Sequence, residues 1–368
     1  MVYFIVCGLL ASLFAYLSYS QKNRFFMLFA YAVLVYVIGL QDSIGEDYGR
    51  YIQTFQRIQL GLTGGSLWEF GSRDGTYIEY GWYLLNRILG TIINDFHIVS
   101  VVLACCFCYA LDKILKFVPQ KWHWFALLFF YFTIGQMTFC MSGLRQTMAI
   151  ICFMLFTVEW LNKNRIRALL YILVGLTFHN SMIFAMPLAA VILIPLDNII
   201  KYKKTYTIAL ISLYVIGNIF FTQIQAFFYD LTADWIADDV GVGTYYLDEM
   251  MKGTGATLLR SAIDMLFFIP SILAFYNIKD KSIYIILYYI LSIILTLLFG
   301  TTGSLSRIIS YITFMGIPSM CLMLSYIKNK EIRTTIIIAI AVITMIRFNS
   351  ALINPIYMRY IDFHTIVI

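Results

Sequence analysis

Long, continuous runs of apolar residues, separated by short polar segments, extend along most of the chain. Their lengths approach the ~20 residues that an α-helix needs to cross the hydrocarbon layer of a membrane. Because the runs are continuous rather than alternating, they exclude a porin-like β-barrel. We therefore predict an all-α, polytopic transmembrane bundle of about 12 spans, at residues 2–20, 25–40, 98–117, 122–140, 144–161, 166–179, 181–199, 205–228, 257–277, 283–300, 304–327 and 333–350.

Composition agrees with this class. Apolar residues make up 61% of the chain and charged residues 12%, against about 45–50% and about 25% in soluble domains. This excludes a soluble globular protein, a disordered chain and a nucleic-acid-binding protein with a basic face. Since apolar runs repeat throughout, we expect a single integral membrane domain, 1–368.

Residues 80–93 are too short and polar for a span, and we expect a helix at the outer interface.

The distribution of basic residues predicts the orientation. Short segments rich in Lys and Arg should face the cytoplasm, which places the N-terminus outside. The segments with this character contain Lys22, Arg24, Lys113, Lys116, Lys121, Lys163, Arg165, Arg167, Lys201, Lys203, Lys204, Lys279, Lys281, Lys328, Lys330 and Arg333. Twelve of these 16 residues are Lys, whereas nine of the other ten basic residues are Arg. Arginine binds phosphate and carboxylate groups with a bidentate fork, so the asymmetry indicates outer anion binding. The alternative is that each outer Arg pairs with a nearby acid.

Two long outer segments, 41–79 and 229–256, mix acidic, aromatic and glycine residues. Loops on a rigid helical scaffold are where functional sites tend to lie. In the first segment, Asp47 precedes Tyr48 and Tyr51, and Glu79 precedes Tyr80. Carboxylates can accept hydrogen bonds from sugar hydroxyls or remove a proton, and aromatic rings can stack on sugars. The alternative is an ordinary acidic loop.

Arg145 and Gln146 lie at the predicted outer start of a span. A positive charge in the first helical turn is unfavourable for the helix alone but suits a bound anion. A snorkelling Arg at the membrane boundary is the alternative.

Three further candidates lie at outer helix ends. His179, between two apolar runs, can act as a base or as a hydrogen-bond donor, or can simply cap a helix with Asn180 and Ser181. Arg307 and Tyr311 are four residues apart on one predicted helical face. Arg260 is a weaker candidate, because Asp264 one turn later is its expected salt-bridge partner.

The sequence predicts neither a metal site nor a cofactor. The seven cysteines lie in apolar segments without paired zinc spacing. A phosphate-binding glycine loop and a serine nucleophile elbow are also missing. Because the predicted cytoplasmic loops are too short for a nucleotide-sugar domain, any sugar donor should arrive attached to a lipid.

These motifs, in this order, resemble the EpsG family of exopolysaccharide and capsule proteins, which are similar in role to Wzy-type polymerases. The resemblance extends from about residue 40 to 315 and is carried by Asp47-Tyr48 with Tyr51, Glu79-Tyr80-Gly81 with Leu84, Gly143-Leu144-Arg145-Gln146 with Ala149, Phe178-His179-Asn180-Ser181, and Arg307 with Tyr311. One departure is Gln41-Asp42 at the start of the first outer segment, where the family often has an Arg.

The resemblance implies a GT-C-type glycosyltransferase that needs no metal and polymerises repeat units of a capsule, exopolysaccharide or O-antigen. Donor and acceptor would be undecaprenyl-diphosphate-linked oligosaccharides at the outer face of a bacterial inner membrane, with a flippase and a chain-length regulator as expected partners. In this interpretation His179, Asp47 and Glu79 are the candidate catalytic residues. Substrate would be bound by Arg145, Gln146, Arg307, Tyr311, Arg260, Tyr48, Tyr51 and Tyr80. A membrane O-acyltransferase and a lipid-linked sugar transporter or flippase are the alternatives.

Overall fold

The computed structural model describes residues 2–42, 47–67, 77–221, 223, 224, 227, 254–299 and 303–353. Helices dominate these residues, which confirms the predicted helical class. The chain divides into two compact units, the first made of 1–184 and 329–368 and the second of 185–328. Most of the predicted outer segment 229–256 lies outside the described residues, as do Arg73, Lys252 and Arg359.

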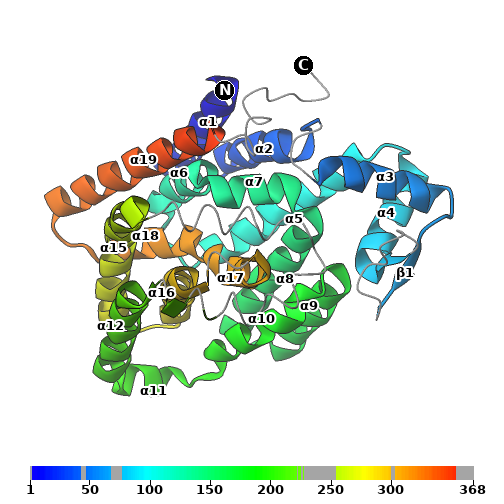
Figure 1. Ribbon diagram of the computed structural model, residues 1–368. Coiled ribbons are helices and arrows are strands. Elements are labelled where there is room, and N and C mark those ends of the chain that lie inside the picture. Colours follow the sequence, from blue (N-terminus) through cyan, green and yellow to red (C-terminus); the bar gives the residue numbers. More distant parts are fainter. Residues whose placement is uncertain are drawn as a thin grey trace. The chain divides into compact units, whose positions relative to one another are not determined.

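The first unit is built mainly from helices that pack on one another (Figure 1). They are α1 (Val2–Ser20), α2 (Phe25–Gly39), α3 (Tyr48–Gln59), α4 (Tyr80–Ile92), α5 (His97–Leu115), η1 (Gln120–Trp122), α6 (His123–Phe132), α7 (Ile134–Ser142), α8 (Leu144–Leu161), α9 (Arg165–Phe178) and α19 (Lys330–Ile353). α2 packs on α1 and α5, α5 on α8, and α8 on α9. This sequence of contacts links the start of the chain to the hairpin that carries Arg145 and His179.

A small structured region follows α2. Strands β1 (Gly64–Ser66) and β2 (Tyr77–Glu79) pair in parallel, with Ser66 opposite Glu79. β2 leads directly into α4, which packs on β1, α3, α5 and α9. The predicted helix at 80–93 is therefore present. Helix α3 was not predicted, although its buried residues follow helical spacing.

The second unit contains the remaining described helices: the end of α10 (Ser181–Ala189), η2 (Ala190–Leu193), α11 (Leu196–Lys201), α12 (Lys203–Ile219), α15 (Thr254–Asn277), α16 (Ile283–Phe299), α17 (Gly303–Thr313) and α18 (Gly316–Tyr326). α16 packs on α12, α15, α17 and α18. Eleven of the 17 residues of α16 are buried, so it forms the core of this unit.

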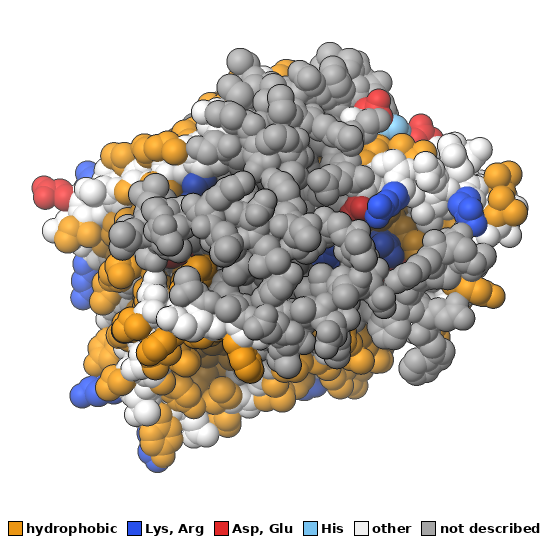
Figure 2. All heavy atoms as spheres, viewed as in Figure 1, with side chains coloured by type: hydrophobic (Ala, Val, Ile, Leu, Met, Phe, Trp, Pro, Cys, Tyr) orange, Lys and Arg blue, Asp and Glu red, His pale blue; other side chains and the backbone are white. Residues whose placement is uncertain are grey.

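Four described segments are long and apolar enough to cross a membrane: Tyr3–Ser20, His97–Leu115, Leu144–Leu161 and Arg307–Tyr326. A fifth candidate is the pair Gln120–Phe132 and Gly135–Ser142, which is bent by 68°. We predicted one span over 122–140, and the helix breaks within it at Thr133, whose φ of −82° and ψ of 87° are not helical. Hydrophobic side chains cover much of the described surface in Figure 2, as expected next to lipid. The count of about 12 spans stays a prediction.

The first unit has two distinct ends. At one, which we call the basic end, Arg24 pairs with Asp112 and the guanidinium of Arg333 lies over the ring of Trp122. These residues come from three segments predicted to face the same side of the membrane. At the opposite end of α2, Gln41 donates a hydrogen bond to the carbonyl of Met141, close to Arg145. We call this second end the Arg145 end.

Candidate functional site

A tight turn between α7 and α8 positions Arg145. Gly143 alone separates the two helices, with a non-helical φ of −96° and ψ of 51°. The carbonyl oxygen of Phe139 accepts hydrogen bonds from the Gly143 amide, at 2.8 Å, and from the Thr147 hydroxyl, at 3.1 Å. Because this turn ends α7 and starts α8, Arg145 falls in the first turn of α8.

Arg145 forms an ion pair with Glu79, the last residue of β2. Its Nη1 atom donates to Oε2 of Glu79 at 2.6 Å. The Glu79 side chain is 8% exposed and that of Arg145 is 31% exposed. From the sequence we expected different roles for these residues, anion binding for Arg145 and catalysis for Glu79. The structure brings them together, so Glu79 holds the guanidinium.

Tyr51 of α3 forms the second wall around Arg145. The guanidinium carbon lies 5.9 Å from the centroid of the Tyr51 ring, which is within range of a cation–π interaction. Tyr51 is buried between Trp82, at 5.4 Å, and Phe96, at 6.4 Å between ring centroids. Burial raises the pKa of Tyr51 above its usual value, although the positive charge of Arg145 opposes the shift. Tyr51 therefore stays neutral at physiological pH.

The guanidinium retains hydrogen-bonding capacity. Its Nε atom is buried and has no hydrogen-bond partner among the described residues. An unpaired buried donor costs about 1–3 kcal/mol, so an anion that reached it would gain a preformed contact. Glu79 is bound through one oxygen by one nitrogen, and the guanidinium also has a hydrogen-bonding interaction with the Tyr51 side chain, so Nε is the donor that is left over.

Tyr48 has a structural role in the described residues. It is 1% exposed, its ring packs on Phe96 at 5.5 Å, and its hydroxyl donates to the carbonyl of Gln41 at 3.1 Å. Gln41 is itself buried and donates to Met141 at 2.6 Å. The expectation that Tyr48 stacks on a sugar is therefore corrected. Gln41, which stands where the family often has an Arg, likewise has a structural role, because its hydrogen bond to Met141 supports the turn that carries Arg145.

His179 lies at the same end as Arg145 because α8 and α9 form an antiparallel hairpin. Gly175 faces Cys152, since a Cβ added to Gly175 would lie 3.1 Å from the Cβ of Cys152. His179 follows Gly175 by one helical turn, and Arg145 precedes Cys152 by about two turns. Arg145 at the start of α8 and His179 at the end of α9 therefore lie at the same end of the hairpin.

Gly81 connects this hairpin to the Glu79 segment. A Cβ added to Gly81 would clash with Oγ1 of Thr177 and lie 2.9 Å from the Thr177 carbonyl oxygen. Gly81 follows Glu79 by two residues, and Thr177 precedes His179 by two. The absence of a side chain at Gly81 therefore lets the starts of α4 and α8 and the end of α9 meet.

Hydrogen bonds fix the state of the His179 ring. Its Nδ1 atom accepts from the backbone N–H of Ser181 at 3.1 Å and lies 2.8 Å from the Ser181 hydroxyl. A backbone amide can only donate, so Nδ1 carries the lone pair and the proton of the neutral ring is on Nε2. His179 is therefore arranged as an Nε2–H donor, which argues against the base role that we favoured from sequence.

Asp47 and Tyr80 are the most accessible candidates at this end. Asp47 precedes α3, its side chain is 50% exposed, and its Oδ1 lies 3.7 Å from Nη1 of Arg50. Tyr80 begins α4 and is 43% exposed. Gln146, by contrast, is buried in α8. Of the three candidate tyrosines at this end, Tyr80 is exposed, whereas Tyr48 and Tyr51 are buried.

The candidates of the second unit have different surroundings. On α17, Arg307 is exposed and Tyr311 is fully buried, so they do not present the shared surface that we expected from their spacing. Arg260 lies in α15, and its side chain is outside the described residues. Within the described residues, no cluster of His, Cys, Asp or Glu is placed to hold a metal ion.

Two of the predicted outer arginines stabilise local structure. Arg87 donates to the carbonyls of Ile58 and Gln59, at 3.0 and 3.1 Å, and so caps the end of α3. Arg57 donates to the Thr63 hydroxyl at 3.3 Å. The outer arginines therefore do not form a single anion-binding site. Arg145 differs from Arg57 and Arg87 in its buried surroundings.

Comparison with protein families decides the class of this chain. Residues 24–364, nearly the whole sequence, match the EpsG family. The chain belongs to the EpsG family. Searches of curated proteins and of solved structures found no match. Membership confirms the resemblance read from the motifs and indicates a membrane protein of polysaccharide biosynthesis, similar to polymerases.

Proposed function

We propose that this protein is a polysaccharide polymerase that joins lipid-linked repeat units at the extracytoplasmic face of a bacterial inner membrane. The growing glycan on undecaprenyl diphosphate is the donor, and a hydroxyl of an incoming lipid-linked repeat unit is the acceptor. The observation that carries the proposal is Arg145, held between Glu79 and Tyr51 with an unused buried N–H. Family membership supplies the polysaccharide context.

The reaction forms one bond and breaks another at the anomeric carbon of the donor. The acceptor oxygen attacks this carbon and gives its proton to a base. The bond from the anomeric carbon to the diphosphate oxygen breaks, and undecaprenyl diphosphate leaves with the electron pair. Negative charge therefore builds on the diphosphate in the transition state, where preorganised cations and donors are most effective.

Arg145 is assigned to the leaving diphosphate. Glu79 and Tyr51 hold its guanidinium before substrate arrives, so little reorganisation is needed during the reaction. The Nε2–H of His179 would add a neutral donor to the same anion or to a sugar oxygen. Arg307 and Arg260 of the second unit remain further candidates for phosphate binding.

Asp47 is our preferred base for the acceptor hydroxyl. Glu79 is occupied by Arg145, and Nδ1 of His179 is occupied by Ser181, whereas Asp47 is half-exposed and its contact with Arg50 is long. Asp47 lies one helical turn before Tyr51, whose amide donates to the Asp47 carbonyl. Tyr80, exposed at the start of α4, would stack on a sugar ring.

Polymerisation by purified protein tests the proposal. Protein reconstituted in liposomes and incubated with its lipid-linked repeat unit should form a ladder of longer glycans on a gel. We expect Asp47→Asn to abolish the ladder while Asp42→Asn, a nearby exposed acid, retains it. A ladder from Asp47→Asn at the normal rate would remove Asp47 from the mechanism. Transport of the repeat unit across the liposome membrane without any ladder would instead favour the flippase alternative.

Cysteine labelling tests the proposed orientation. In a cysteine-free background, Arg50→Cys should react with a membrane-impermeant maleimide in intact cells, because the Arg50 side chain is 85% exposed at the Arg145 end. Lys163→Cys, in the turn between α8 and α9, should react only after permeabilisation. The reverse pattern would place the Arg145 end in the cytoplasm and contradict the use of an outer-leaflet donor.

A further inference from the structure

A surface groove at the basic end of the first unit is not part of the site described above. It has a volume of 670 Å³ and runs between α2 and α5. Its wall on α2 is formed by Phe25, Leu28, Ala32 and Val35, and its wall on α5 by Cys105, Cys108, Tyr109 and Asp112. Both sets follow helical spacing, so each helix presents one continuous, mainly apolar face to the groove.

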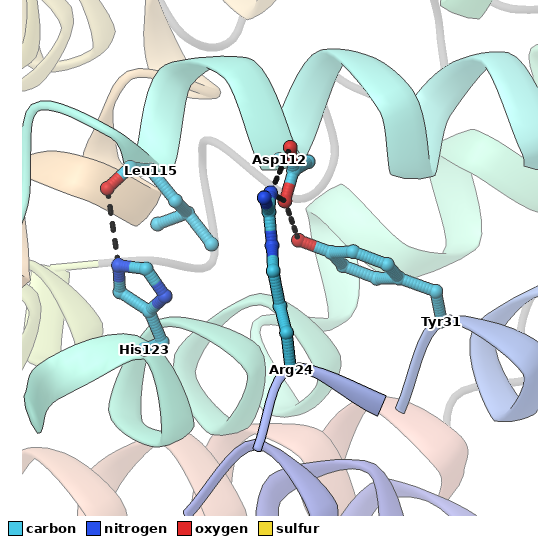
Figure 3. A network of polar contacts seen from close by, with 5 residues as sticks. All are labelled: Arg24, Tyr31, Asp112, Leu115 and His123. Atoms are coloured by element: carbon cyan, nitrogen blue, oxygen red, sulfur yellow. Dashed lines mark hydrogen bonds and ion pairs between the residues drawn. The ribbon is translucent and has the colours of Figure 1, made fainter. Parts of the chain in front are cut away.

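The charged residues lie together at one end of this groove. Nη2 of Arg24 contacts both carboxylate oxygens of Asp112, at 3.2 and 3.1 Å, and the Tyr31 hydroxyl also donates to Asp112 (Figure 3). Helix α5 ends just beyond, where His123 donates to the carbonyl of Leu115 at 3.0 Å. The rest of the groove, toward Val35 and Cys105, is apolar.

The groove has the dimensions and polarity of one membrane lipid. From Arg24 to Val35 the helix rises about 16 Å, close to half of a hydrocarbon layer about 30 Å thick. An acyl chain along α2 would therefore fill one leaflet. Several lining residues are exposed in the described structure, including Phe25 at 59% and Leu28 at 61%, so the groove is open to lipid from the side.

The charge at the polar end favours an anionic headgroup. Arg24 keeps 72% of its side chain exposed and contacts Asp112 through Nη2, which leaves other N–H groups for phosphate. Lys113 lies beside the groove, with Nζ 4.9 Å from the ring centroid of Tyr109. Two cations and one carboxylate give this end a net positive charge. Basic pockets between membrane helices are typical binding sites for anionic lipids.

We propose that this groove binds one anionic phospholipid, with an acyl chain between α2 and α5 and the phosphate on Arg24 and Lys113. The site is separate from the glycosyl transfer site, because Arg24 and Gln41 lie at opposite ends of α2. A lipid bound here would fasten α2 to α5, and α2 leads through Gln41 to the turn that carries Arg145. The inference does not depend on the proposed polymerase activity.

Native mass spectrometry of delipidated full-length protein in detergent tests the proposal. Titration with phosphatidylglycerol should give a first binding event about fivefold to thirtyfold tighter than with phosphatidylcholine of the same chains, as expected for one or two interfacial cations. Arg24→Gln should abolish this preference. Arg167→Gln, which removes an exposed positive charge from the first turn of α9 on the predicted cytoplasmic side, should retain it.

A second variant tests the groove itself. Ala32→Phe fills the apolar wall without changing charge and should weaken binding of both lipids by about fivefold or more. Variants are compared only where size-exclusion profiles and melting temperatures match the parent protein. Equal affinity for the two lipids, or an equal loss for Arg24→Gln and Arg167→Gln, would overturn the proposal. Stronger binding of undecaprenyl phosphate than of phosphatidylglycerol would also overturn it, because the groove would then be a site for the substrate lipid.

Discussion

The two ends of the first unit each carry an arginine–carboxylate pair, but the pairs differ in burial. Arg145 and Glu79 have side chains that are 31% and 8% exposed, and Tyr51 lies against the guanidinium. Arg24 and Asp112 are 72% and 26% exposed and border an open groove. Desolvation makes the first pair expensive to break, whereas water screens the second.

This difference indicates which pair can support chemistry. A guanidinium held in place away from bulk water stabilises developing charge more than one that moves freely in water. Arg145 lies on α8 and its two partners lie on α3 and β2, and only tertiary packing brings these three segments together. Arg24 needs just the ends of α2 and α5. The two proposals use this difference: Arg145 would stabilise the transition state, and Arg24 would anchor a lipid.

The largest expected effect is on activity at Arg145. Arg145→Lys keeps the charge but removes the planar fork and the Nε–H group, so we expect polymerisation to slow by about 10²–10³. Initial rates of ladder formation at saturating donor measure this effect. Arg24→Lys is the matched control and should retain most of the activity. Equal losses of polymerisation rate in Arg145→Lys and Arg24→Lys would show that the two ends do not differ in their contribution to catalysis.

Glu79→Gln should give the next largest effect. The amide keeps the size of the side chain and a hydrogen-bond acceptor but leaves Arg145 without its anionic partner. We expect a tenfold to hundredfold loss of rate, the equivalent of a charged hydrogen bond worth about 1.5–3 kcal/mol. If Glu79 acts only by holding Arg145, then Glu79→Gln should add little to the loss in an Arg145→Lys background. Fully multiplicative losses in the double variant would indicate an independent role for Glu79.

The sequence could predict the members of this site but not their pairing. Both Arg145 and Glu79 stand out as charged residues near apolar runs, yet they are 66 positions apart, and α4 must pack on α9 before they meet. Helix α3 was within reach of sequence reasoning, because Tyr48, Tyr51, Phe55 and Ile58 follow a helical pattern. We assigned this segment to a loop because its acids and glycines dominated the interpretation.

The buried roles of Tyr48 and Gln41 had no comparable signal. A tyrosine beside an acid fits a sugar site and a helix contact equally well, and only packing on Phe96 distinguishes them. The state of His179 was likewise beyond the sequence, since it depends on which atom accepts the Ser181 amide proton. Apolar periodicity thus predicts helices well, whereas roles of polar residues depend on contacts between distant segments.

Gly81→Ala should reduce stability and separate the segments of the Arg145 end. The added Cβ would meet Thr177, so α4 must move away from α9 at a cost of about 1–3 kcal/mol. Gly49→Ala is a matched control, because both glycines follow a tyrosine at the start of a helix and Gly49 has no atom within 4 Å of an added Cβ. We expect a lower melting temperature for Gly81→Ala, and an unchanged or slightly higher one for Gly49→Ala. Equal melting temperatures would show that α4 and α9 tolerate separation.

Stability should change least at the basic end. Arg24→Gln removes an exposed ion pair, and such pairs contribute about 0.2–1 kcal/mol. We expect a small shift in melting temperature by scanning fluorimetry in a neutral detergent. The shift should shrink as salt rises, because an exposed pair is screened at high ionic strength. Glu79→Gln, measured in the same detergent, should show a larger shift that changes less with salt. A loss at Arg24 as large as that at Glu79 would mean that burial does not separate the two pairs, and the assignment of chemistry to the Arg145 end would lose its physical basis.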